Sequence, residues 1–134
     1  MNILNGIVKA AEAFEHHRLP EVFAGFSQSQ FSVPVRYPVA CHPQAWAAGS
    51  IPFMVSSLLG LSADAFNGRL RVIRPVLPPS VSDLEFRRLK IGGSTLDLHF
   101  QRTRDRAATV KVVNRVGNVE VEVEVEPELE SKAA

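Results

Sequence analysis

The chain is poor in cysteine, in net charge and in uninterrupted apolar sequence. A single cysteine, Cys41, excludes an intramolecular disulfide and a cysteine-based metal cluster. The 15 basic and 14 acidic residues nearly cancel, and no basic run is interleaved with aromatics as a nucleic-acid groove requires. The longest apolar run, residues 45–61, is broken by glycine, proline and serine and falls short of the ~20 residues of a membrane span. We therefore expect neither nucleic acid nor membrane as a partner.

Signals for export, metals and cofactors are also missing. Residues from Met1 onward form no basic and apolar leader, so we expect a cytoplasmic location. His16 and His17 are adjacent and would project in different directions, while His99 belongs to a distant segment, so we expect no metal site. No glycine-rich phosphate loop follows a strand pattern, and we expect no cofactor.

The first half of the chain has helical periodicity. Apolar residues recur at helical spacing over 2–14, which predicts an amphipathic helix terminated by His16 and His17. A second, buried helix should begin near Pro43 and end near Gly60, with a kink at Pro52. Between them lies a long loop, 15–42, and loops of that length in compact domains are usually functional.

After residue 68 the periodicity changes to alternation, which predicts strands separated by turns. The expected strands are 69–74, 83–91, 95–102, 109–114 and 118–125. Gly92-Gly93 and 116–118 suit hairpin turns, and 104–106 suits a charged tip. The predicted fold class is α+β: two helices followed by an antiparallel sheet of about five strands. We expect a helical segment 1–66, a β cap 67–126 packed with it as one domain, and a frayed tail 127–134.

The last predicted strand alternates valine with glutamate from Val119 to Glu126. Its valines should face the core and its glutamates the water. An acidic stripe of this kind can bind cations or a basic partner, but a solvated face that resists aggregation is the favoured interpretation.

The residues best equipped for chemistry lie around the long loop. Glu21 stands between Pro20 and Val22, which could desolvate the carboxylate and raise its pKa. Trp46 could stack on a sugar ring, Gln44 could donate and accept hydrogen bonds beside it, and Tyr37 could line the same loop. Alternatively, Glu21 is an ordinary surface-loop residue and Trp46 fills the junction between helices and sheet.

Two stretches resemble the C-terminal signature of the amylo-α-1,6-glucosidase (glycogen debranching) family. They are Arg18–Phe26, with its Leu-Pro-Glu-Val-Phe-Ala-Gly sequence, and Tyr37–Trp46, with its Cys-His-Pro-Gln-Ala-Trp sequence. The resemblance implies that the two helices are the last pair of an (α/α)6 toroid, that Glu21 is the general base of an inverting glycosidase, and that Gln44, Trp46 and Tyr37 contact an α-glucan. Arg36 departs from the family pattern, which more often has a neutral residue there.

Glycoside hydrolysis also needs a general acid, and none is convincing in this chain. Its aspartates at 64, 83, 97 and 105 fall in the linker and the strands, remote from the loop. In the family the acid comes from an earlier helix hairpin. The resemblance therefore implies a C-terminal part that is inactive alone and needs the N-terminal part of the toroid.

A non-catalytic carbohydrate-binding or subunit-interaction module is the alternative function. We also expect the chain to form a homodimer, because its helices have apolar stripes that one small sheet covers only in part. The residues expected in that interface are Ile3, Ile7, Ala11, Phe53 and Leu58.

Overall fold

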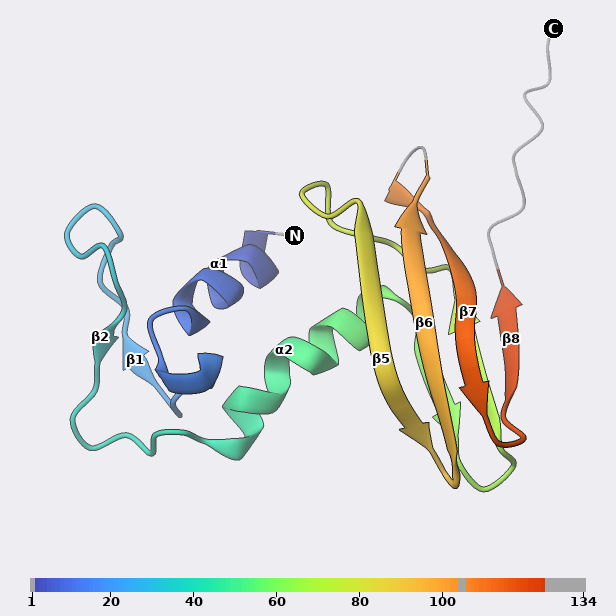
Figure 1. The fold of residues 1–134 in the computed structure, drawn as a ribbon. Coiled ribbons are helices and arrows are strands. Elements are labelled where there is room, and N and C mark those ends of the chain that lie inside the picture. The colour runs from blue at the N-terminus through green and yellow to red at the C-terminus, as the bar shows by residue number, and fades with distance from the viewer. Residues whose placement is uncertain (1, 104–105, 125–134) are drawn as a thin grey trace, which may run out of the picture. The chain divides into compact units, whose positions relative to one another are not determined.

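The computed structural model describes residues 2–103 and 106–124, and it has the α+β character expected from the sequence (Figure 1). The chain divides into two compact units, Met1–Val55 and Ser56–Ala134, and each is described by itself. The predicted tail, 127–134, lies outside the described residues. The structure thus groups residues 56–66 with the strands rather than with the helical segment.

Unit 1 is built on helix α1, Asn2–Ala11. The helix ends earlier than the predicted residue 14, and the chain turns through 3-10-type hydrogen bonds into the short helix η1, Glu15–His17. Since His16 and His17 have positive φ angles of 53° and 56°, they form this turn and are not the end of α1 itself.

Unit 1 has a small core, to which α1 contributes part of its apolar stripe. The buried members of the core are Ala10, Ala11, Phe14 and Leu19, with Ile7, Ala47 and Ile51 packed against them. Ile3 and Val8, which the periodicity places on the same stripe, are exposed instead.

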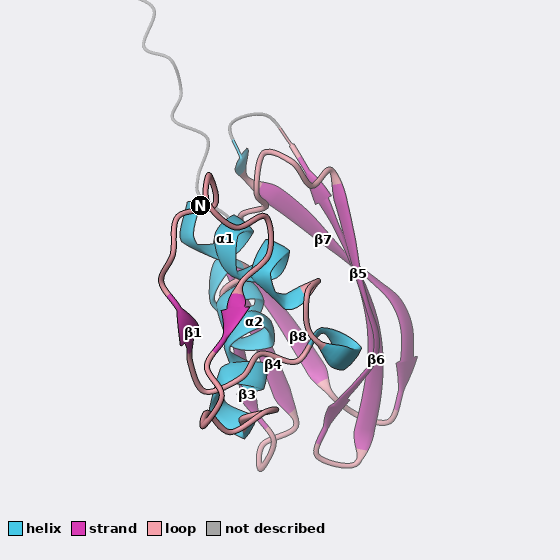
Figure 2. Cartoon of the chain, turned by 90° about the vertical axis from the view of Figure 1, so that its left-hand side faces the viewer, coloured by secondary structure: helices cyan, strands magenta, loops and turns pink. Residues whose placement is uncertain are grey.

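The predicted long loop contains a two-stranded antiparallel ribbon of β1, Phe23–Ala24, and β2, Val35–Arg36 (Figure 2). Phe23 is opposite Arg36, and Ala24 is opposite Val35. At the tip, a turn closes with hydrogen bonds from the N–H groups of Gln30 and Phe31 to the Ser27 carbonyl.

Helix α2, Ala45–Leu58, begins in unit 1 and ends close to Gly60, as predicted. It continues through Pro52. The expectation of a buried helix is wrong, because no residue of α2 is buried and Phe53 is 73% exposed. The reason is that only the Ala47 and Ile51 side of the helix has the small unit 1 core to pack against.

Unit 2 contains two three-stranded sheets that form two layers (Figures 1 and 2). One sheet has the order β3-β4-β8 and the other the order β5-β6-β7. The strands are β3 (Leu61–Asp64), β4 (Arg69–Ile73), β5 (Asp83–Ile91), β6 (Ser94–Arg102), β7 (Ala108–Val116) and β8 (Glu120–Glu124). The buried side chains of Leu70, Val72, Leu96, Leu98 and Phe100 come from both sheets.

The topology corrects the predicted single antiparallel sheet. Strands β5, β6 and β7 are antiparallel neighbours, and Gly92-Gly93 makes the expected tight turn between β5 and β6. Strand β8, however, pairs in parallel with β4, so residues 116–118 carry the chain from one sheet to the other and do not close a hairpin. Strand β3 was not predicted. Of the predicted charged tip, residues 104 and 105 lie outside the described part.

The acidic face of β8 is paired with arginines and is not simply turned to water. Its ion pairs join Arg69 to Glu120 and Glu122, Arg71 to Glu122 and Glu124, and Arg74 to Glu124, with N–O distances between 3.0 and 3.9 Å. All these side chains are partly exposed, so each pair contributes at most about 1 kcal/mol. The negative charges of β8 are thus paired with positive charges on β4 and on Arg74, the residue that follows it.

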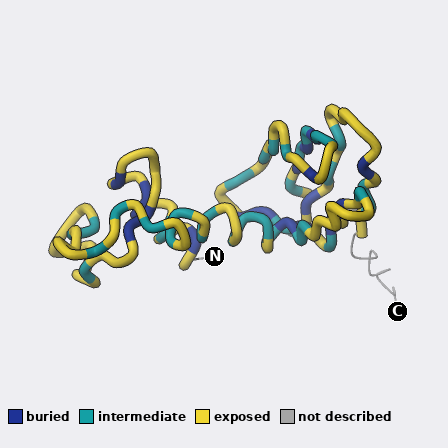
Figure 3. Tube along the Cα trace, turned by 90° about the horizontal axis from the view of Figure 1, so that it is seen from below, coloured by how far each residue is buried: buried dark blue, intermediate teal, exposed yellow. Residues whose placement is uncertain are grey.

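The two units differ in which large apolar side chains they bury. Figure 3 shows the burial of each described residue along the trace. The larger buried side chains are concentrated in unit 2, whereas most of the large exposed ones belong to unit 1. Those exposed in unit 1 are Ile3, Val8, Val22, Phe23, Phe26, Phe31, Val33, Tyr37, Val39, Trp46 and Phe53. Unit 1 thus leaves many of its large apolar side chains exposed.

Candidate functional site

The two stretches that resemble the debranching signature lie side by side in unit 1. The N–H of Glu21 donates to the Cys41 carbonyl at 2.9 Å, and the Cys41 N–H donates to Oε2 of Glu21 at 3.3 Å. The Gln44 N–H donates to the Leu19 carbonyl at 3.2 Å. Residues 19–21 and 41–44 are therefore fastened together, with the Glu21 carboxylate at the junction.

An aromatic cluster packs next to this junction, because His42 belongs to both. The buried ring of Phe14 lies 6.0 Å from the ring of Phe23 and 5.4 Å from that of His42. The Arg36 guanidinium lies over the same ring, 5.7 Å from its centroid. Arg36, whose role the sequence left in doubt, therefore makes a cation–π contact with the core.

Of the predicted sugar-contacting residues, Trp46 and Tyr37 are exposed and Gln44 is half-buried. Trp46 is 89% exposed in the first turn of α2. Tyr37 is 52% exposed, and Oε1 of Gln44 accepts the Ala45 N–H at 3.2 Å. Within the described residues no hydrogen bond or ring contact joins Trp46 or Tyr37 to Glu21. Only Gln44 is tied to the same junction, through its backbone.

The carboxylate of Glu21 is exposed, so Pro20 and Val22 do not desolvate it as the sequence suggested. Unit 1 contains no aspartate, and Glu12 and Glu15 are its other carboxylates. Both are exposed, and Oε1 of Glu15 lies 3.4 Å from Nε2 of His16. In addition, no three His, Cys, Asp or Glu side chains among the described residues are grouped to hold a metal ion. The site offers one oriented carboxylate and no companion acid.

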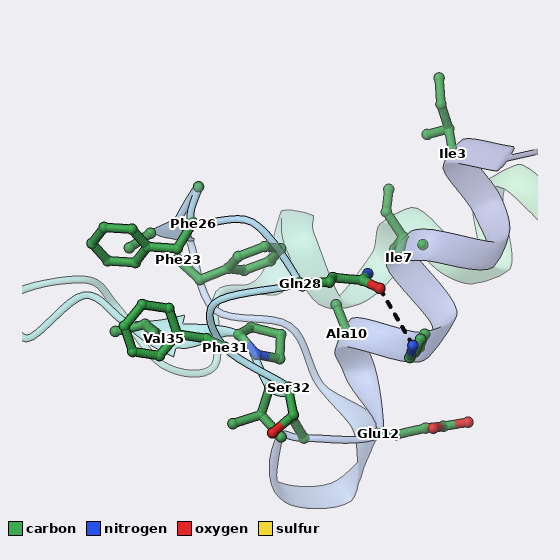
Figure 4. Close-up of a pocket in the computed structure, with 17 residues that line it drawn as sticks. Ile3, Ile7, Ala10, Glu12, Phe23, Phe26, Gln28, Phe31, Ser32 and Val35 are labelled. Atoms are coloured by element: carbon green, nitrogen blue, oxygen red, sulfur yellow. Dashed lines mark hydrogen bonds between the residues drawn. The ribbon is translucent and has the colours of Figure 1, made fainter.

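A groove of about 460 Å³ lies between α1 and residues 23–35 (Figure 4). Ile3, Ile7 and Ala10 line it on the helix side, and Phe23 and Phe26 are among the residues that line it on the loop side. Figure 4 shows one polar bridge along its wall, in which Nζ of Lys9 donates to Oε1 of Gln28 at 3.3 Å. Mostly apolar walls with few polar groups suit an apolar ligand or partner segment.

The sequence analysis missed this groove, and Glu21, Gln44, Trp46 and Tyr37 do not line it. The available signal was the placement of three phenylalanines, Phe23, Phe26 and Phe31, in a loop rich in proline, glycine and serine. Large apolar residues in a loop bury little surface unless something else covers them.

Scans of known protein families, curated proteins and solved structures find no match to this chain. Among its described residues, neither helix has the length and apolar character needed to cross a membrane. The assignment of a function therefore depends on the site itself.

Proposed function

We propose that this chain is the C-terminal part of an amylo-α-1,6-glucosidase-like hydrolase acting on α-glucans in the cytoplasm. The observation that carries the proposal is the pairing of residues 19–21 with 41–44, which brings the two motif stretches together around Glu21. Two motif stretches that are separated in sequence can form one site only if the fold brings them together. Here the backbone joins them directly.

In this proposal Glu21 is the general base of an inverting reaction. The N–H of Cys41 fixes the direction of the carboxylate through Oε2, and we assign Oε1 to accept a proton from the attacking water. Trp46 and Tyr37 offer exposed aromatic faces to sugar rings, and the Gln44 side chain lies at the start of α2 between them and Glu21 in sequence. No metal or organic cofactor is needed for these steps.

In this proposal the general acid comes from another polypeptide segment, because unit 1 supplies no second carboxylate at the junction. The same segment would cover the apolar surface of unit 1, and burial around Glu21 would strengthen its action as a base. The chain alone should therefore not release glucose from maltodextrin or from branch points.

The test is complementation with an N-terminal segment that carries the rest of the toroid, using glucose release from branched α-glucan as the measurement. Glu21→Gln should lower the complemented rate about 10²–10⁴-fold, since glutamine keeps the shape but accepts no proton. Glu15→Gln, also exposed in unit 1, is the matched control and should leave the rate unchanged. A loss of only a fewfold with Glu21→Gln, or turnover by the chain alone, would contradict the proposal.

A non-catalytic subunit-interaction or carbohydrate-binding module is the second candidate. The groove and the exposed apolar side chains of unit 1 favour it, because they suit a protein surface better than a hydroxyl-rich sugar. A glucan pull-down with turnover measured in the same tube separates the two functions. Retention without turnover in the complemented complex would favour the binding module.

A further inference from the structure

The sheet β5-β6-β7 is interrupted on both sides of one residue, Asp97. Between β5 and β6 the register shifts after Phe86↔Leu98 and resumes at Leu89↔Leu96, so two residues of β5 oppose Asp97. Between β6 and β7 the register shifts from Asp97↔Asn114 to Leu98↔Val112, which leaves Val113 as an extra residue. Two bulges therefore meet at the same position of the sheet, and bulges commonly re-aim side chains beside binding sites.

Hydrogen bonds from both neighbouring strands fix the Asp97 carboxylate. Its Oδ1 accepts the Arg88 N–H at 2.6 Å, and its Oδ2 accepts Nδ2 of Asn114 at 3.4 Å. Arg88 adopts a positive φ of 57°, an uncommon conformation for a residue other than glycine. The residue that donates this N–H therefore departs from regular strand geometry. Each carboxylate oxygen can accept a further hydrogen bond.

A second charged pair is fixed beside it. Arg87 donates to Oε2 of Glu85 from both Nε, at 2.8 Å, and Nη2, at 2.6 Å. This hydrogen bond raises the pKa of Arg87, which therefore stays charged. Both donors share this one acceptor oxygen, which leaves Oε1 of Glu85 and the Nη1 group of Arg87 able to hydrogen-bond to a ligand.

These groups line a hollow of about 350 Å³ in unit 2. Its walls are Glu85, Phe86, Arg87, Asp97, Leu98 and Val113. Val113 is 60% exposed and gives the hollow an apolar patch next to fixed donors and acceptors. Because Arg87 offsets Glu85, the lining keeps a net charge of −1 from Asp97, whose carboxylate already accepts two hydrogen bonds.

We propose that this hollow is a second binding site, for a neutral sugar ring. Hydroxyl groups can donate to the carboxylates of Asp97 and Glu85 and accept from Arg87, while the C–H face of the ring packs on Val113. The shallow contact area predicts a dissociation constant on the order of millimolar. The site lies in unit 2 and is independent of Glu21. Only the choice of an α-glucan as the probe depends on the proposed function.

The test is a titration of the ¹⁵N-labelled full chain with maltotriose, followed by amide shifts in two-dimensional NMR spectra. Saturable shifts should appear at residues 85–88, 97–98 and 113–114. Arg87→Ala should weaken binding by fivefold or more, and its exposed side chain makes a folding defect unexpected. Lys90→Ala, an exposed cation of the same strand outside the hollow, is the matched control and should bind as the unmodified chain does.

Several outcomes would overturn the proposal: no saturable shift in this sheet, equal binding by Arg87→Ala, or shifts produced by Ca²⁺ but not by the sugar. Glu21→Gln should leave the sheet shifts intact. Shifts at residues 21, 41–44 and 46 report separately on unit 1. Failure of the second site and failure of the proposed catalytic site are thus read from different amides.

Discussion

At the scale of single residues, Gly60 occupies the most constrained position after α2. Its φ is +59°, and a Cβ built there would lie 1.8 Å from the carbonyl oxygen of Ile73. The carbonyl of Gly60 in turn accepts the Ile73 N–H at 3.0 Å. The end of the helix and the end of β4 therefore approach so closely that no side chain fits between them.

We predict that Gly60→Ala lowers the free energy of unfolding by at least about 2 kcal/mol, because backbone must move to accommodate the methyl group. Gly93→Ala is the control, since nothing lies within 4 Å of a Cβ there and its φ is not in the left-handed region. Urea denaturation followed by circular dichroism measures both. Equal effects of the two substitutions would show that the close approach at Gly60 is not maintained in solution.

Residue-scale features were predicted unevenly. Glycine ends helices at little steric cost, so the position of Gly60 was foreseeable. The partner of Glu21 was not, because a hydrogen bond from the Cys41 backbone depends on the path of the chain between them and leaves no trace in residue types. The exposure of Glu21 was also misjudged, since apolar neighbours in sequence need not pack on a side chain.

At the scale of elements, the turn from β3 to β4 is held by one carboxylate. The Asp64 carboxylate accepts the Asn67 N–H at 3.1 Å and Nδ2 of the same residue at 2.7 Å. The side-chain hydrogen bond is the main cause that lowers the pKa of Asp64 below its model-compound value of 3.8. Gly68, with φ +62°, completes the turn.

Replacing Asn67 by alanine removes the side-chain hydrogen bond and keeps the one from the backbone N–H, so the pKa of Asp64 should rise part of the way toward 3.8. Because the pKa is depressed in the folded state, the turn's contribution to stability is present above that value and is lost as pH falls through the folded pKa. A carboxyl-carbon NMR titration of Asp64 measures the change, with Asn5→Ala in unit 1 as the control. An unchanged titration in Asn67→Ala would contradict the assignment.

The strands could be predicted where apolar and polar residues alternate over many positions, so that one face of the strand is apolar and the other polar. Strand β5 was predicted at its observed bounds, Asp83–Ile91, because apolar and charged residues alternate through most of it. Strands β1 and β2 have two residues each, too few for any periodicity. The parallel pairing of β8 depends on a partner far away in the sequence, and local pattern carries no information about it.

At the scale of the whole molecule, the apolar surface of unit 1 has a direct consequence for association. Of the residues expected in a homodimer, Ala11 is buried in its own unit and is unavailable, whereas Ile3 is 74% exposed. Phe26, also exposed, lines the same groove as Ile3. The groove is therefore a better candidate interface than the helix stripe predicted from the sequence.

We predict that the isolated chain self-associates at micromolar concentration and that Ile3→Ser with Phe26→Ser reduces this association, because both substitutions remove apolar area from the groove. Val116→Ser, an exposed apolar residue of unit 2, is the control and should change nothing. Multi-angle light scattering gives the molar mass. A clean monomer at all concentrations would show that unit 1 tolerates its exposed surface.

The parallel pairing of β4 with β8 also bears on how the chain folds. Strands β5, β6 and β7 lie between them in sequence and can pair through short connections, whereas β8 must close a much longer loop before it meets β4. During synthesis this edge of β4 therefore has no partner until β8 has left the ribosome. Arg69 and Arg71 lie on β4 and Arg74 follows it, so the unpaired edge is positively charged. Like charges on an open edge repel a second copy of the chain. The glutamates of β8 thus attract β8 to this edge, while its arginines repel the same edge of a second copy.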